Sequence, residues 1–208
     1  MRNILKAAAG AIGVLALLGL GAPAMAQVES TQVEAVQIQD DDIFYGKTDA
    51  PVTIVEYASL TCPHCRKFHE ETLPALKKGA IADGQVRVVY RDFPLDGLAL
   101  RASALARCGG PERRLAILDL LFSSQERWSR TNDPLGALVQ IGKLAGLKEE
   151  QSRACMEDRG MFDQIIAEAQ IGEQKHGVRS TPSFVVNDKL YRGALTAEEM
   201  QSVIDAAQ

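Results

Sequence analysis

The sequence predicts an α/β protein in which a long helical segment interrupts a small sheet. Three observations predict this class. A β-branched apolar segment at Val52–Ala58 precedes a helical pattern and a second strand-like segment at Gln85–Phe93. Residues 98–176 then show helical patterning and no convincing strand. Two more strand-like segments and a last helix follow, so the expected order is β-α-β, about five helices, and β-β-α.

The first 26 residues have the pattern of a secretory signal peptide. Arg2 and Lys6 form a short positive region, residues 7–20 are uncharged and apolar, and small residues precede an expected cleavage after Ala26. A membrane anchor is the alternative, but the apolar stretch is shorter than the ~20 residues that a spanning helix needs. We therefore expect the protein to be exported.

The charge balance argues against two classes of partner. The formal net charge is −4, and removal of Arg2 and Lys6 with the signal peptide changes it to −6. The mature chain also has no basic cluster. Nucleic acid and anionic lipid attract positively charged surfaces, so neither is expected as a partner.

The N-terminal segment is expected to be loosely held and the central block to be helical. Residues 27–48 are expected to form a loosely held N-terminal leader with one strand near Ile43–Tyr45. A helix is expected directly after Cys62, and Pro74 should kink or shorten it. The expected helices of the central block are Leu98–Arg107, Glu112–Gln125, Pro134–Ala145, Lys148–Glu157 and Asp163–Lys175.

The end of the chain predicts a hairpin and a helix. Strand-like segments lie on both sides of Asn187 and Asp188. The sequence from Thr196 to Glu199 is a capping box that opens a helix ending near Ala206. We therefore expect one domain made of residues 49–96 and 177–208, with a helical insertion at 97–176.

The candidate site is the sequence Cys62-Pro63-His64-Cys65 at the first strand-to-helix junction. A helix N-terminus carries unpaired N–H groups and partial positive charge, which lower the pKa of a cysteine placed there. Proline is favourable at the first helical position. We expect Cys62 to be the exposed, attacking sulfur and Cys65 to be the buried, resolving one.

Three other ionisable side chains lie close to this pair in the sequence. The His64 imidazole can stabilise the Cys62 thiolate, and a solvated residue is the alternative. Glu56 lies in an apolar strand, where a carboxylate needs a partner. It is expected either beneath the cysteines, accepting the proton of Cys65, or on an edge strand facing solvent. His69 is interpreted as a surface residue.

The sequence Thr181-Pro182 opens the third strand-like segment. A cis peptide bond here would set the Thr181 backbone beside a reactive sulfur. Since only about 5% of such bonds are cis, sequence physics alone favours trans.

With these residues the chain resembles the DsbA family of exported thiol:disulfide oxidoreductases. The resemblance covers residues 42–208 and implies a thioredoxin fold with an inserted helical domain. It also implies that Cys62 is the nucleophile, that His64 tunes it, that Pro182 is cis, and that Glu56 matches an acid of the family. The periplasm is the implied location, and no cofactor is implied.

Partners and the remaining cysteines are also interpreted through this resemblance. The substrates would be reduced, unfolded exported proteins, and a DsbB-like membrane quinone reductase would reoxidise the dithiol. Cys108 and Cys155 are extra relative to the simplest members, and a structural disulfide is expected. A redox-active role for these two cysteines is the alternative.

Two further functions stay open. An isomerase or reductase would use the same dithiol and would be kept reduced by a DsbD-like partner. Thr181 does not decide the direction, because threonine also occurs at this position in isomerase relatives. A metal-binding module is the second alternative, but no second close cysteine pair is present, and no metal site is expected.

Overall fold

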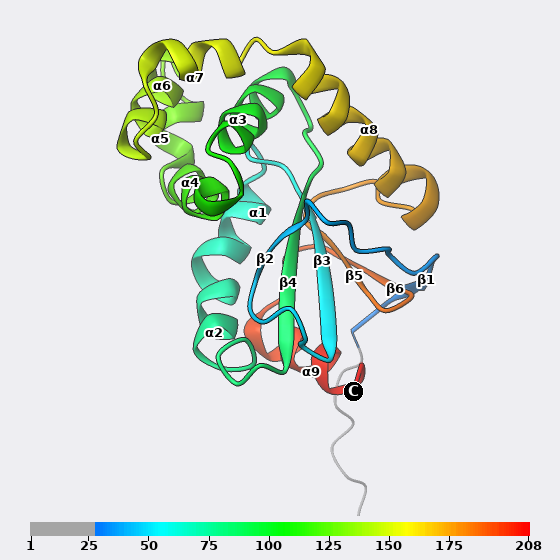
Figure 1. Cartoon of the computed structure of the whole chain (residues 1–208). Coiled ribbons are helices and arrows are strands. Elements are labelled where there is room, and N and C mark those ends of the chain that lie inside the picture. The colour runs from blue at the N-terminus through cyan, green and yellow to red at the C-terminus, as the bar shows by residue number, and fades with distance from the viewer. Residues whose placement is uncertain (1–27) are drawn as a thin grey trace, which may run out of the picture.

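A mixed sheet lies at the centre of the computed structural model, which describes residues 28–208 (Figure 1). Within these residues the strand order is β1 (Thr31–Gln32), β6 (Lys189–Arg192), β5 (Ser183–Val186), β3 (Val52–Ala58), β4 (Val86–Asp92) and β2 (Ile43–Tyr45). β3 and β4 are parallel, and the other neighbouring pairs are antiparallel. The predicted α/β class and strand positions are confirmed. The predicted signal peptide, residues 1–26, lies outside the described residues.

The segment expected to be a loose leader is instead held to the sheet, so that prediction is wrong. β1 pairs with β6, and β2 pairs with β4. Between them, the carboxylate of Asp42 accepts two hydrogen bonds from the buried Arg91 guanidinium, at 2.7 and 3.0 Å. The Gln37 carbonyl oxygen accepts a third, at 2.7 Å. A buried guanidinium requires such partners, so it fixes this segment in place.

The helix after β3 is continuous but changes its winding. It comprises α1 (Pro63–Lys67), a π-helical turn η1 (Phe68–Thr72) and α2 (Leu73–Lys78). Pro74 follows the wide turn. Because proline has no N–H to donate to the preceding turn, a change in helical winding is expected near it. The predicted kink or shortening therefore takes the form of a local π-helical segment.

One face of the sheet is covered by this helix and by α9 (Ala197–Asp205). Phe68, Leu73 and Leu76 pack with apolar strand residues, among them Ile54, in one buried cluster, to which α9 adds Met200 and others. The predicted capping box is present at the start of α9. Strand and helix register therefore place the first turn of α1 at the carboxyl end of β3.

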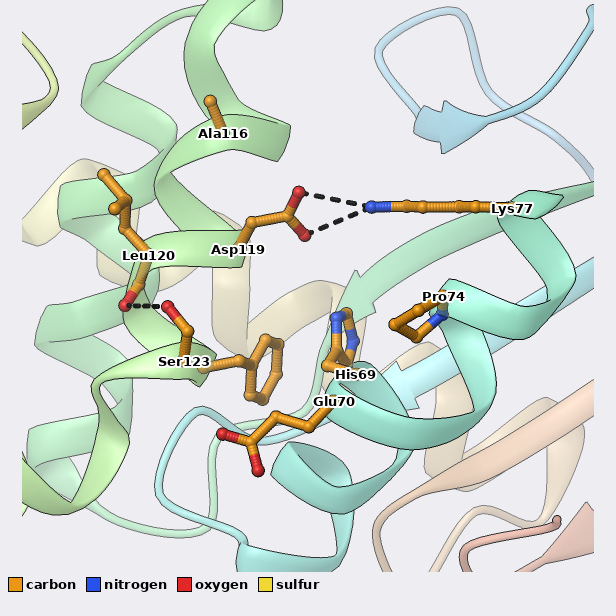
Figure 2. Close-up of a pocket in the computed structure, with 9 residues that line it drawn as sticks. His69, Glu70, Pro74, Lys77, Ala116, Asp119, Leu120 and Ser123 are labelled. Carbon is orange, nitrogen blue, oxygen red and sulfur yellow. Dashed lines mark hydrogen bonds and ion pairs between the residues drawn. The ribbon is translucent and has the colours of Figure 1, made fainter. Parts of the chain in front are cut away.

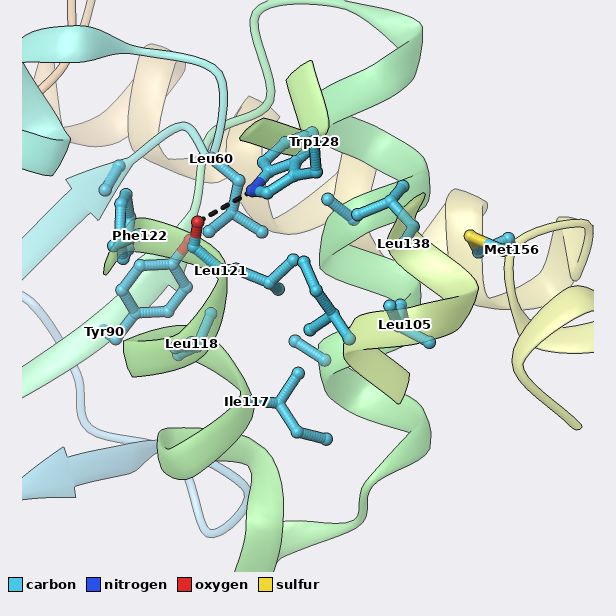
Figure 3. Close-up of a cluster of buried hydrophobic side chains, with 14 of the residues drawn as sticks. Leu60, Tyr90, Leu105, Ile117, Leu118, Leu121, Phe122, Trp128, Leu138 and Met156 are labelled. Atoms are coloured by element: carbon cyan, nitrogen blue, oxygen red, sulfur yellow. Dashed lines mark hydrogen bonds between the residues drawn. The ribbon is translucent and has the colours of Figure 1, made fainter. Parts of the chain in front are cut away.

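The central block forms a second helical layer. Its helices are α3 (Gly97–Cys108), α4 (Pro111–Ser123), α5 (Gln125–Ser129), α6 (Pro134–Leu144), α7 (Glu149–Cys155) and α8 (Arg159–His176). Figure 3 shows the core shared by α3 to α6, which contains Leu105, Ile117, Leu121, Trp128 and Leu138. The predicted helix over 112–125 ends at Ser123, because Ser124 departs from helical geometry and α5 begins separately.

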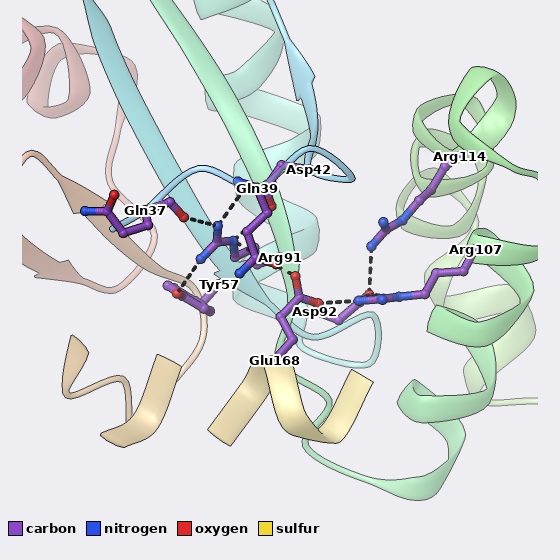
Figure 4. Close-up of polar contacts among 9 residues, drawn as sticks. All are labelled: Gln37, Gln39, Asp42, Tyr57, Arg91, Asp92, Arg107, Arg114 and Glu168. Atoms are coloured by element: carbon purple, nitrogen blue, oxygen red, sulfur yellow. Dashed lines mark hydrogen bonds and ion pairs between the residues drawn. The ribbon is translucent and has the colours of Figure 1, made fainter. Parts of the chain in front are cut away.

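A disulfide and a charged network hold this block together and to the sheet. Cys108 and Cys155 are joined by a disulfide between the ends of α3 and α7, with Cα atoms 6.0 Å apart. At the end of β4, buried Asp92 accepts hydrogen bonds from Arg107 and Arg114, at 2.8 and 2.9 Å (Figure 4). Burial alone would raise the pKa of Asp92, but the two guanidinium groups outweigh it and lower the pKa.

The domain boundaries at 96/97 and 176/177 stay a prediction. Across residues 28–208, no helix combines the length and hydropathy needed to cross a membrane.

Candidate active site

The two free cysteines lie at the first turn of the helix that follows β3. Cys62 is the N-cap residue, with extended backbone angles, and Pro63 begins α1. Cys62 is 6% exposed, whereas Cys65 is fully buried. Cys62 is therefore more exposed than Cys65, as expected, and of the two cysteines only Cys62 is accessible to another molecule.

The loop before β5 lies against Cys62. The Thr181–Pro182 peptide bond is cis, as the family resemblance implied and against the general preference for trans. The Cys62 thiol donates a hydrogen bond to the Thr181 backbone carbonyl at 3.3 Å, across 119 positions of sequence. Fold topology thus brings Thr181 and Pro182 to the dithiol.

The surroundings of Cys62 favour its anionic form. They lower its pKa to about 5, first through a hydrogen bond from the Cys65 side chain. Partial burial opposes this shift, while the Thr181 side chain and the backbone N–H groups of Cys65 and His64 add to it. The helix-start amides therefore contribute as expected, although the neighbouring thiol contributes more.

His64 acts on Cys62 through its backbone. Its backbone N–H helps to lower the pKa of Cys62, and its side chain is exposed on α1. A tuning role for the imidazole stays a prediction.

The Cys65 thiol is held in its neutral form. Burial is the largest cause of its raised pKa, followed by its hydrogen bond to Cys62 and the nearby charge of Glu56. The two sulfurs thus have opposite preferences: Cys62 for thiolate and Cys65 for thiol.

Glu56 lies inside the protein, in the central strand β3. Its side chain is fully buried, between Tyr90 of β4 and Phe184 of β5 in the sheet register. The alternative of an edge-strand residue reaching solvent is therefore wrong. A buried carboxylate requires a partner, and Glu56 has one in His69.

His69 is not a surface residue, contrary to the prediction. It is 8% exposed, and its Nε2 lies 3.0 Å from Glu56 Oε2. Its ring stacks on Phe122 of α4, with centroids 3.9 Å apart. His69 follows Cys65 by four positions, which places both on the same helical face. That spacing was the available sequence signal.

Gln125 is a second residue that sequence reasoning missed. Its buried side-chain amide donates hydrogen bonds to the backbone carbonyls of Leu60 and Cys62, at 2.8 and 3.0 Å. It therefore ties the start of α5 to the loop that carries the nucleophile. No spacing signal in the sequence links these positions, which are more than 60 residues apart.

Within residues 28–208 no group of three or more His, Cys, Asp or Glu side chains is arranged to hold a metal ion.

A dithiol at a strand-to-helix junction, facing a cis-proline loop and backed by a buried acid, defines a thioredoxin-fold protein with an inserted helical layer. A family model described as "Thioredoxin" matches residues 39–206. The chain belongs to the thioredoxin family and, within it, to the DsbA-like proteins.

The similar proteins are named for disulfide chemistry. A putative protein-disulfide oxidoreductase of Rickettsia bellii is 33% identical over 152 residues, which cover 73% of this chain and 59% of that protein. Disulfide bond formation protein D of Bacillus subtilis is 26% identical, over 77% of this chain and 74% of its own. The chain thus spans about three fifths of the length of the Rickettsia protein.

Among solved structures, alpha-DsbA1 of Wolbachia pipientis superposes with a TM-score of 0.75. It is 30% identical to this chain, and the match covers 82% of this chain and 92% of the solved one.

Proposed function

We propose that this protein is an exported thiol:disulfide oxidoreductase that acts as an oxidase, donating a Cys62–Cys65 disulfide to reduced, unfolded exported proteins. The observation that carries the proposal is the lowered pKa of Cys62, about 5. A stable thiolate stabilises the reduced enzyme and so makes its disulfide more oxidising. At pH 7 this shift corresponds to about 3 kcal/mol, or roughly 60 mV for the two-electron couple.

The chemistry has two exchange steps. A substrate thiolate attacks Cys62 Sγ, a substrate–Cys62 disulfide forms, and Cys65 leaves with the electron pair and takes up a proton. A second substrate thiolate then attacks the substrate sulfur of this mixed disulfide. The substrate disulfide forms, and Cys62 leaves as the thiolate that its surroundings stabilise.

The other site residues position and tune this pair. Thr181 and Pro182 place a backbone carbonyl beside Cys62, where an extended substrate segment would pass. His64 would tune the thiolate from the surface. Glu56 would exchange a proton with Cys65, whose thiol responds to its charge.

Export and reoxidation complete the proposal. We infer a periplasmic location after cleavage behind Ala26, and reoxidation of the dithiol by a DsbB-like membrane quinone reductase. Cys108 and Cys155 would be structural, because their disulfide joins two helices of the central block.

The test measures Cys62 and the direction of exchange together. Thiolate absorbance of the reduced protein should titrate near pH 5, and equilibration with glutathione should show a disulfide more oxidising than that of thioredoxin. The oxidised protein should introduce disulfides into reduced, unfolded ribonuclease A, and Cys62→Ser should not.

An ordinary thiol pKa with a thioredoxin-like potential would overturn the oxidase assignment. If the reduced protein then restored scrambled ribonuclease A, the isomerase or reductase with a DsbD-like partner would take its place. Trapping of free thiols in intact cells gives the same distinction, because an oxidase is kept oxidised and an isomerase reduced.

A further inference from the structure

Each catalytic cycle of the proposed exchange must bring one proton to Cys65 and later remove it. Cys65 is fully buried, and burial raises the pKa of its thiol. A proton therefore cannot reach this sulfur from bulk solvent without a carrier.

Glu56 is the first candidate carrier, but it is equally isolated. The carboxylate is fully buried, and its Oε1 has no hydrogen-bond partner among residues 28–208. Its other oxygen, Oε2, lies 3.0 Å from His69 Nε2. Glu56 thus acts on Cys65 through its charge and makes its side-chain hydrogen bond with His69, and its burial keeps it from solvent.

The His69 ring is held in one orientation, and its two nitrogens have different surroundings. Its ring stacks on Phe122 at an interplanar angle of 18° and meets the rings of Phe68 and Tyr90 edge-on. These contacts hold Nε2 toward Glu56. The second ring nitrogen, Nδ1, is buried and has no hydrogen-bond partner among the described residues. A neutral imidazole can accept a proton at one nitrogen and release one from the other.

His69 also lines a pocket of about 620 Å³ between α2 and α4. In Figure 2 its ring lies below the Lys77–Asp119 ion pair, with Pro74 beside it. The pair is 3.2 Å long, and its side chains are 35% and 48% exposed. The pocket therefore extends from a solvent-exposed edge to the buried imidazole.

We propose that His69 carries protons between Glu56 and solvent through this pocket, which makes the pocket the proton entrance of the dithiol site. The inference rests on the proposed disulfide exchange. When a substrate thiolate displaces Cys65, one proton moves from Glu56 to Cys65, one from His69 to Glu56, and one from solvent to His69. Reoxidation runs the same transfers in reverse, so the net exchange is one proton between solvent and Cys65.

The charged and titratable groups around His69 are few. Glu56 of β3 and Tyr90 of β4 face it from the sheet, and Cys65 lies one turn earlier on its own helix. Lys77 and Asp119 at the pocket edge neutralise each other, and Glu70 pairs with Arg66 at 3.0 Å. Glu56 is thus the group in direct contact with the imidazole.

A single-turnover experiment separates the two sulfurs. Reduced protein is mixed with glutathione disulfide, quenched with acid, and resolved by mass spectrometry into reduced, glutathionylated and disulfide forms. Cys62 attacks first and releases one glutathione. Cys65 must then lose its proton to attack Cys62 and release the second.

His69→Gln should slow the second step at least tenfold and change the first by less than twofold. The rate of the second step should then rise in proportion to hydroxide concentration, because hydroxide replaces the carrier. His69→Gly should behave alike and recover most of the lost rate with added imidazole, which enters through the pocket. His176→Gln, which removes a different buried imidazole, should leave both steps unchanged.

Ala116→Phe tests the entrance with the His69–Glu56 contact kept, because Ala116 is exposed on α4 and lines the pocket. Ala116→Phe alone should slow the second step. Combined with His69→Gly, it should abolish the rescue by imidazole. Glu112→Phe, on the same helix outside the pocket lining, is the matched control. Ala116→Phe keeps the proposal testable even if the His69 variants fold poorly.

An unchanged second step in His69→Gln or Ala116→Phe would overturn the inference and leave the proposed function standing. Equal loss of both steps in the His69 variants, without rescue by imidazole, would assign His69 a purely structural role. Wild-type protein that does not react with glutathione disulfide would instead overturn the proposed function itself, and the inference with it.

Discussion

The side-chain amide of Gln125 lies 3.0 Å from the backbone carbonyl oxygen of Cys62, although 63 positions separate the two residues. The same amide nitrogen also donates to the Leu60 carbonyl. One residue of the helical layer therefore holds the short loop that leads from β3 to the nucleophile at two points, Leu60 and Cys62. The helical layer is thus part of the site and not only a cover for it.

Gln125→Ala should destabilise the protein by about 1–3 kcal/mol, because two buried carbonyls lose their donor. Urea unfolding measures the effect, with the exposed Gln174→Ala as the control. Gln125→Glu should in addition raise the pKa of Cys62, since a carboxylate would stand beside the thiolate. A change in unfolding free energy below about 0.5 kcal/mol in the alanine variant would contradict the assigned role.

Cys65→Ala should raise the pKa of Cys62 above its value of about 5, because the hydrogen bond from Cys65 is the largest favourable cause of the shift. Cys65→Ser keeps a hydroxyl donor and should stay closer to wild type. The pH dependence of Cys62 alkylation measures both variants. A midpoint that stays near 5 in both variants would show that the helix-start amides and the Thr181 side chain suffice.

Removal of the Cys108–Cys155 disulfide by the double change Cys108→Ser and Cys155→Ser should cost about 2–4 kcal/mol of stability, because the bridge closes a long loop. The two cysteines are 47 positions apart. The thiol titration of Cys62 should not change. Loss of oxidase activity in this variant, without a loss of stability, would support the redox-active alternative.

Glu168→Gln should flatten the pH dependence of stability. Burial, and then the charge of Asp92, raise the pKa of Glu168 from 4.5 to about 7. The folded state therefore holds a proton that the unfolded state has lost, and this group's stabilising contribution falls as pH rises through that window. The loss is at most about 3 kcal/mol.

Urea midpoints at pH 5 and pH 8 measure this effect. The wild type should lose more stability than Glu168→Gln between the two values, and the exposed Glu173→Gln should follow the wild type. The opposite order would mean that the ion pair with Arg107 outweighs the burial of Glu168.

The sequence by itself determined the elements and the reactive pair. Strand, helix and capping signals are local, so β3, β4, the hairpin and the start of α9 could be placed from residue spacing. Cys62 and Cys65 were found for the same reason: their chemistry depends on one helix turn and its unpaired N–H groups.

Only the tertiary structure decided what surrounds that pair. Burial of Glu56 depends on strand order, which makes β3 central, and no local pattern gives strand order. His69 and Gln125 acquire their partners from β3 and from the loop after it, through contacts of 13 and about 63 positions. Such contacts depend on how separate layers pack, because a side chain's surroundings are set by the whole fold and not by its neighbours in the chain.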